Sequence, residues 1–180
     1  MIHLTQLKSI DCSSNLLTSL NVQGLNNLTS LQCIWNQLTT LNLKDLPNLT
    51  SLICHNNKLK KLDLNEFTNL KTIVCSDNEL LSLDVDKLFN LTTLSCGRNQ
   101  IKFLNVKELI NLRSLGCEWN QLVSLDVKVL VNLESFACND NQLTLIDLKN
   151  LLNLSVIDCS RNKLKSLELR GLSKLINLNC

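Results

Sequence analysis

Nine cysteines recur at intervals of 21 residues along this 180-residue chain, with no insertion or deletion between them. They are Cys12, Cys33, Cys54, Cys75, Cys96, Cys117, Cys138, Cys159 and Cys180. A fixed period of about 20 to 50 residues indicates a solenoid of stacked supersecondary units. One such turn has too few partners to bury its own apolar side chains, so it must stack on its neighbours. The sequence therefore predicts one continuous domain, 1–180.

The same 21-residue period relates further sets of polar and apolar residues. We call each set of residues at one repeat position a column. An asparagine stands three residues after each of the first eight cysteines, at Asn15, Asn36, Asn57, Asn78, Asn99, Asn120, Asn141 and Asn162. Apolar residues begin turns at positions 4, 25, 46, 67, 88, 109, 130 and 151, and a partial turn covers 172–180. An asparagine side chain at a bend can satisfy backbone N–H and C=O groups that no strand reaches. We therefore expect the asparagines to form a structural ladder.

One turn can be laid out from its alternation of side chains. In Ser51-Leu52-Ile53-Cys54, the period of two predicts a short strand with Leu52 and Cys54 pointing inward. Residues 59–69 have inward leucines at irregular spacing, which favours 3₁₀ turns or extended pieces over a long α-helix. The predicted fold class is an α/β horseshoe-type solenoid that is rich in β-structure. Its parallel β-sheet forms the concave face, 3₁₀ or irregular segments form the convex face, and little true α-helix is expected.

These residues carry a family resemblance. The segment Leu28-x-x-Leu31-x-Cys33-x-x-Asn36-x-Leu38 resembles the LxxLxLxxNxL core of leucine-rich repeats, with Cys in place of one Leu. Eight successive turns match in phase. The 21-residue turn with this cysteine resembles the bacterial surface variety, internalin J-like and Bacteroidetes leucine-rich-repeat proteins. The resemblance implies a module that binds a protein, with an adhesin-type role on a cell surface.

Composition and the lack of known motifs argue against several other classes of function. The 18 basic and 16 acidic residues are spread along the chain and give a net charge of +2, without the concentrated positive face that nucleic-acid binding needs. No stretch approaches the roughly 20 apolar residues of a membrane span. No Ser–His–Asp set, Gly-rich phosphate loop or HExxH helix is present, so we expect neither enzymatic activity nor a cofactor. We expect neither a nucleic-acid partner nor insertion into a membrane.

The two ends of the chain bear on localisation. The residues Met1-Ile2-His3 make a minimal start, and no signal peptide is recognisable there. The chain by itself is expected to be cytoplasmic. If it is a fragment of an internalin-like protein, it is expected to be secreted or located on the cell surface. The half-built last turn favours a fragment of a longer, capped protein, or a chain whose ends meet a partner.

Two functional interpretations of the cysteines are disulfide bonds and a metal site. A column of parallel side chains does not converge as a disulfide requires, and it places ligands on a line rather than around one point. An odd count also argues against complete pairing. The favoured interpretation is free thiols that act as small buried hydrophobes. Cys180 is the expected exception, since it lies on the partial turn.

Other candidates for chemistry have structural explanations. His3 and His55 lie in different parts of the stack. One repeat column contains Asp63, Asp84, Asp126 and Asp147 but also Asn42 and Asn105, so its charge is not required and a backbone-capping role is expected. Sequons at Asn27, Asn48, Asn90 and Asn153 follow from a second asparagine column and are weak evidence for glycosylation.

The variable columns at the strand and the following bend remain for ligand binding. The predicted site consists of Ile34, Trp35, Ile53, His55, Val74, Arg98, Glu118 and Trp119. The first five are expected to form an exposed apolar patch, and tryptophan and arginine are typical interface anchors. Arg98 and Glu118 also suit an ion pair. The alternative for each tryptophan is that it folds over its own loop and shields the asparagine ladder.

The predicted function is a protein-binding module, with carbohydrate as a further possible ligand. Fold alone does not fix function, so this expectation rests on analogy. The alternative is a structural spacer, or a solenoid that assembles end to end without a specific ligand on its concave face. Concentration-dependent assembly through the ends would favour the spacer.

Overall fold

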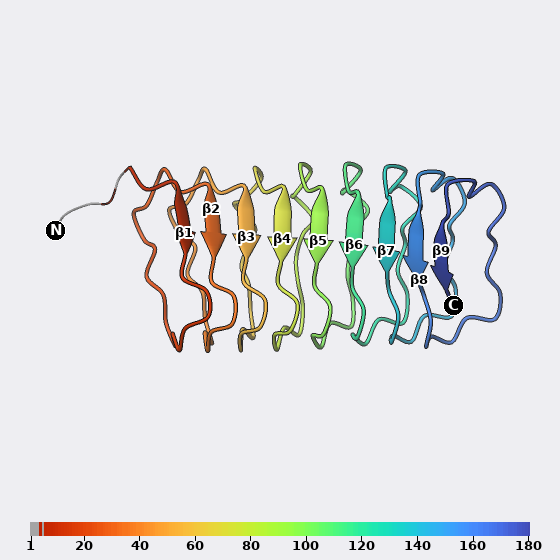
Figure 1. Cartoon of the computed structure of the whole chain (residues 1–180), viewed down its shortest axis with the longest axis horizontal. Helices are drawn as coiled ribbons and strands as arrows, with labels where there is room; N and C mark the ends of the chain where they lie inside the picture. Colours follow the sequence, from red (N-terminus) through yellow and green to blue (C-terminus); the bar gives the residue numbers. More distant parts are fainter. Residues whose placement is uncertain (1–3, 5) are drawn as a thin grey trace.

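The computed structural model describes residues 4 and 6–180 and consists of nine short parallel strands in one sheet. His3 lies outside the described residues. The strands stand side by side along the length of the molecule, and each turn of chain passes once around the stack (Figure 1). Their bounds are β1 Ser9–Asp11, β2 Ser30–Gln32, β3 Ser51–Ile53, β4 Thr72–Val74, β5 Thr93–Ser95, β6 Ser114–Gly116, β7 Ser135–Ala137, β8 Val156–Asp158 and β9 Asn177–Asn179.

The strand register repeats the sequence period without a slip. Ser51 of β3 pairs with Thr72 of β4, Leu52 with Ile73, and Ile53 with Val74, each 21 residues apart. The predicted strand is thus confirmed, although it ends at Ile53. The cysteine that follows points into the core and still donates its backbone N–H to the carbonyl of Val74, at 2.8 Å.

The core is a set of apolar columns rather than one central cluster. The middle residue of each strand from β2 to β8 is buried, and so are the cysteine column and most of the leucines of the return path. Phe136 replaces an aliphatic side chain in this stack and is 1% exposed. Because each buried side chain contacts its counterparts one turn above and below, the turns stabilise each other and no turn can fold alone.

The return path is irregular, as the sequence predicts. The part of the chain that the structure describes contains no helix of either the α or the 3₁₀ kind. Single tight turns replace them, for example the backbone N–H of Leu49 to the carbonyl of Leu46 at 3.2 Å, and that of Leu70 to Phe67 at 3.0 Å. None of the described residues forms a helix that is long and apolar enough to cross a membrane.

The first asparagine column forms the predicted ladder. The side-chain Nδ2 of Asn99 donates to the carbonyls of Cys75, Cys96 and Gly97 at 3.0–3.1 Å. Its Oδ1 accepts the backbone N–H of Leu80 from the preceding turn at 3.0 Å. Asn99 is 9% exposed, so one buried side chain satisfies four backbone groups on two turns. The same set of bonds recurs around Asn36, Asn57, Asn78, Asn120, Asn141 and Asn162.

The second asparagine column works between turns on the other side of the strands. Asn48 donates through Nδ2 to the carbonyl of Asn26 at 2.8 Å, and Asn111 donates in the same way to Phe89 at 2.9 Å. These side chains therefore link consecutive turns just before the strands.

All nine cysteines are free. Seven of them, from Cys33 to Cys159, are buried in one ladder, while Cys180 is exposed as expected. Burial raises the pKa of the Cys33 thiol to about 12, and the neighbouring Cys12 adds to this shift. The interior thiols are thus held in the neutral form, in keeping with their interpretation as small hydrophobes.

Candidate ligand-binding surface

The bend that follows each strand has an unusual backbone. One residue in each turn adopts a positive φ between 50° and 56°, in the left-handed region. These residues are Ser14, Trp35, Asn56, Asp77, Arg98, Trp119, Asp140 and Arg161. Asparagine and aspartate enter this region readily, whereas a bulky side chain there is an outlier. The bend therefore projects a row of side chains outward along one edge of the sheet, and two of them are tryptophans.

Both tryptophans are open to solvent. Trp35 is 61% exposed and Trp119 is 45% exposed, while the asparagine that follows Trp35 is only 9% exposed. The ladder beneath each bend is satisfied by hydrogen bonds within the backbone of two turns. Both indoles therefore keep a substantial part of their surface in contact with solvent.

The structure places the residues of the predicted apolar patch on β3, on β4 and at the bends that follow β2 and β3, and only Trp35 among them is exposed. Ile53 of β3 is in register with Val74 of β4, and Ile34 and Trp35 lie at the bend of the preceding turn. Ile34, Ile53 and Val74 are half-buried. His55 closes the patch, and its Nδ1 lies 2.7 Å from Nδ2 of Asn56.

A second cluster surrounds Trp119. The guanidinium carbon of Arg98 lies 4.9 Å from the Trp119 ring centroid, and that of Arg161 lies 5.7 Å away. Arg161 also binds Asp140 through two bonds, Nε to Oδ1 at 2.6 Å and Nη2 to Oδ2 at 2.7 Å. Arg98 lies one turn before Trp119 and Arg161 two turns after it, so contacts from both sides hold the Trp119 ring in place.

The expected ion pair between Arg98 and Glu118 does not form. The carboxylate within reach of Arg98 is that of Asp77, with Nε to Oδ1 at 3.9 Å. Arg98 instead stacks on Trp119 because both side chains leave left-handed bends on adjacent turns and point along the same edge. Both charges of the Arg98–Asp77 pair are well exposed, so this pair contributes little to stability.

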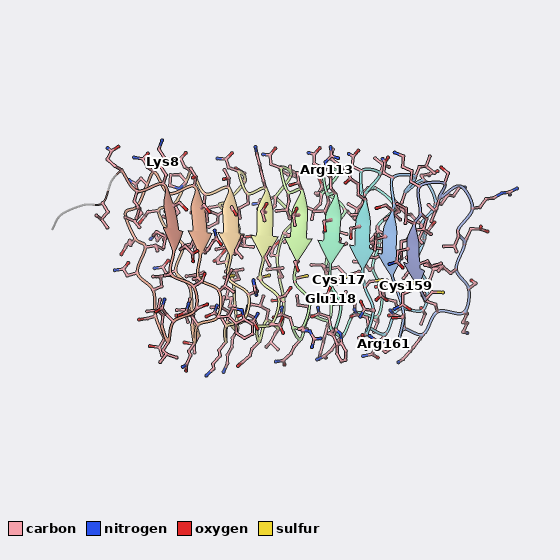
Figure 2. The ribbon with its side chains drawn as sticks, in the orientation of Figure 1. Lys8, Arg113, Cys117, Glu118, Cys159 and Arg161 are labelled. Carbon is pink, nitrogen blue, oxygen red and sulfur yellow. The ribbon has the colours of Figure 1, made fainter. Side chains whose placement is uncertain are left out.

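Glu118 lies in a hollow made by two glycines. A Cβ atom at Gly97 would lie 2.1 Å from Oε1 of Glu118, and one at Gly116 would lie 3.1 Å from Oε2. Among the described residues, Oε2 of Glu118 is a buried side-chain oxygen without a hydrogen-bond partner. Figure 2 shows Glu118 beside Cys117 at the carboxyl end of β6, and Arg113 at the opposite end. A larger residue at position 97 or 116 would displace this carboxylate.

Two further carboxylates near this edge are held ionised. The hydrogen bond from Arg161 is the largest cause of the lowered pKa of Asp140. Burial opposes ionisation of Asp158, but bonds from Ser160 and Asn179 outweigh it, so the pKa of Asp158 is also lowered. Both groups therefore carry negative charge at neutral pH.

Apolar exposure on the return path was not anticipated from the sequence. Leu81, Phe103, Val123 and Leu145, on four consecutive turns, are 58–70% exposed. Phe103, Val123 and Leu145 line a hollow of about 510 Å³ with the neighbouring Lys107–Asp126 and Lys128–Asp147 pairs. The available signal was that both columns have only Thr, Ser or Lys in the first three turns, whereas one of the two has a large apolar residue in each of the next four.

The part of the chain that the structure describes contains no group of three or more His, Cys, Asp or Glu side chains arranged to hold a metal ion. The cysteines are spread along the ladder one to a turn.

Comparison with solved structures places the fold. The functional domain of InlJ from Listeria monocytogenes, which includes a cysteine ladder, is 39% identical over 98% of this chain, with a TM-score of 0.96. YopM from Yersinia enterocolitica is 30% identical over 94% of the chain and 36% of its own, with a TM-score of 0.80. TLR13, in a complex with the RNA ssRNA13, shares the fold alone at 24% identity, 98% and 29% coverage and a TM-score of 0.76.

This chain spans 39% of the InlJ chain. No protein-family model and no curated protein matches the sequence. The agreement with InlJ consists of the shared fold, the 39% identity and the presence of a cysteine ladder in both. The chain is a leucine-rich-repeat protein whose 21-residue turns stack on a cysteine ladder of the kind found in the InlJ domain.

Proposed function

We propose that this chain is a protein-binding module that holds its partner along the bend edge of the sheet, between Trp35 and Trp119. The observation that carries the proposal is that both tryptophans occupy left-handed bends and remain exposed. Such a backbone conformation costs an L-residue about 1–2 kcal/mol. Burial of the exposed rings does not offset this cost. A strained, exposed aromatic residue is a reason to look for a functional role.

The composition of the edge suits a protein surface. Tryptophan and arginine are enriched among residues that dominate binding energy. The Arg98 and Arg161 contacts restrict the Trp119 ring before any partner arrives, which lowers the entropic cost of binding. The half-buried Ile34, Ile53 and Val74 extend the apolar area beside Trp35.

A bacterial surface-recognition role is the finer form of the proposal. It is supported by the similarity to the InlJ domain of Listeria monocytogenes. The similarity covers 39% of the InlJ chain. A surface-recognition activity of a longer protein that contains this chain is therefore also a proposal.

The test compares partner capture by matched variants. Trp35→Asn and Trp119→Asn together remove both rings and place asparagine where the neighbouring bend already has it, at Asn56. Phe103→Ser on the return path removes an exposed ring of similar exposure and serves as the control. A specific partner held by the wild type and the control but lost by the double variant supports the proposal.

Two other outcomes would oppose it. Loss of the partner in the Phe103→Ser variant alone would move the interface to the apolar return path, where Leu81, Val123 and Leu145 are also exposed. Failure to find a specific partner, together with assembly that depends on concentration and is indifferent to the tryptophans, would favour the spacer.

A further inference from the structure

The strand-and-bend face has a charge opposite to that of the whole molecule. We define this face as the residues of each strand and the three that follow it. It contains five carboxylates, of Asp11, Asp77, Glu118, Asp140 and Asp158, and two guanidinium groups, of Arg98 and Arg161, which gives −3. The complete chain has a net charge of +2. A partner with positive charge is therefore steered to this face rather than to the return path.

Most of these charges already have partners within the chain. Arg161 holds Asp140 through two hydrogen bonds, and Asp77 lies near Arg98. The Asp158 carboxylate accepts bonds from Ser160 and Asn179, and Asp11 accepts the backbone N–H of Ser13. Glu118 differs, because its Oε2 is buried and accepts no hydrogen bond from the described residues.

The described residues around Glu118 leave space for its carboxylate but donate no hydrogen bond to Oε2. Gly97 and Gly116 leave the space in which it lies, and the hydroxyls of Ser76 and Ser95 bind each other at 2.8 Å. A buried acceptor without a donor is unfavourable by about 1–3 kcal/mol. Because no hydrogen bond to Oε2 must break, the side chain can swing outward toward a donor, and the glycine hollow then becomes free.

We propose that Glu118 is the specificity residue of the strand-and-bend face, and that it pairs with an arginine side chain of the protein partner. Arginine supplies two N–H donors in a planar fork that matches both oxygens of one carboxylate. The flat guanidinium also fits over a surface of backbone and glycine, where no side chain obstructs it. This inference rests on the proposed function, because it names the partner group that the same face selects.

The probe is a short peptide, acetyl-Gly-Arg-Gly-amide, titrated into the ¹⁵N-labelled chain. The neutral control peptide has citrulline in place of arginine, which keeps the shape and removes the charge. The amide resonances of Gly97 and Gly116 report the site. We expect saturable shifts with the arginine peptide, at a dissociation constant on the order of 1 mM. The citrulline peptide should bind about tenfold more weakly or not at all.

Two variants test whether binding of the arginine peptide depends on the Glu118 carboxylate itself or on any carboxylate of the protein. Glu118→Gln keeps the size of the side chain and should weaken arginine binding about tenfold. Glu134→Gln is the matched control, since Glu134 binds Arg113 at the opposite end of the strands and should leave the titration unchanged (Figure 2 labels Arg113).

Three results would overturn the inference. They are equal shifts with both peptides, shifts that persist in Glu118→Gln, and no shift with the arginine peptide at about 50 mM. Each leaves the proposed function standing if the tryptophan variants still lose their partner. Conversely, arginine binding at Glu118 without a tryptophan-dependent partner would contradict the proposed function alone.

Discussion

The guanidinium carbon of Arg98 lies 4.9 Å from the ring centroid of Trp119, one turn further along the solenoid. Both side chains leave left-handed bends, at φ values of 50° and 53°. The backbone already links these two bends, since the N–H of Arg98 donates to the carbonyl of Glu118 at 2.8 Å. The stacked pair adds a contact between side chains and fixes the direction in which the indole faces solvent.

This stacking predicts a measurable coupling. In a double-mutant cycle with Arg98→Ala and Trp119→Ala, the interaction energy should be about 0.5–1 kcal/mol, as for an exposed cation–π pair. Unfolding in urea provides the free energies. The same cycle with Arg98→Ala and Trp35→Ala should give no coupling, because these residues lie three turns apart. Equal coupling in both cycles would contradict the assigned contact.

The bend at Trp35 predicts a gain from asparagine. Trp35→Asn removes the ring but relieves the left-handed backbone, whereas Trp35→Ala removes the ring without relief. We expect the asparagine variant to be more stable than the alanine variant by about 1 kcal/mol. Urea midpoints of the two variants check this. An alanine variant as stable as the asparagine variant would show that the strain at this bend is negligible.

The asparagine ladder predicts a large loss at an interior position. Asn99→Ala removes four hydrogen bonds to backbone groups and should lower the free energy of unfolding by about 2–3 kcal/mol. Asn15→Ala is the control, since Asn15 is exposed and, within the described part of the chain, its side chain donates to the carbonyls of Cys12 and Ser13 of its own turn. Its loss should be clearly smaller. Similar losses at both positions would contradict a role for bonds between turns.

The cysteine ladder predicts a fall in stability at alkaline pH. Burial raises the folded-state pKa of Cys33 to about 12, above the ordinary thiol pKa of 9.0. The contribution is therefore present below the unfolded pKa and is lost as pH rises toward the folded value. Between about pH 8 and about pH 10, the wild type should lose about 1 kcal/mol more than Cys33→Ala. Parallel losses in the two proteins would show that this thiol titrates equally in both states.

Much of the fold could be predicted from the sequence because the period fixes the register. The strand at Ser51–Ile53, the inward cysteines and the role of Asn99 all follow from columns 21 residues apart. The left-handed bends also left a signal, since Asn56, Asp77 and Asp140 share a column with both tryptophans. Stacking neighbours with the same backbone makes each such inference valid for every turn.

The details of the site could not be predicted in the same way. Where Arg98 points depends on its rotamer and on the ring one turn away, so an ion pair with Glu118 was as plausible as the stack. The position of Glu118 over Gly97 and Gly116 depends on space left by two separate turns. These are contacts between variable columns, in which the repeat imposes the backbone but not the partner.

The most direct test of the central claim is to follow the two indole N–H resonances of Trp35 and Trp119 while a captured partner is titrated into the ¹⁵N-labelled chain. Each tryptophan gives one such signal, and single variants assign them. The account predicts that both signals shift or broaden in proportion to complex formation, because both rings lie in the interface. A complex that forms fully while both indole signals stay unchanged would contradict it.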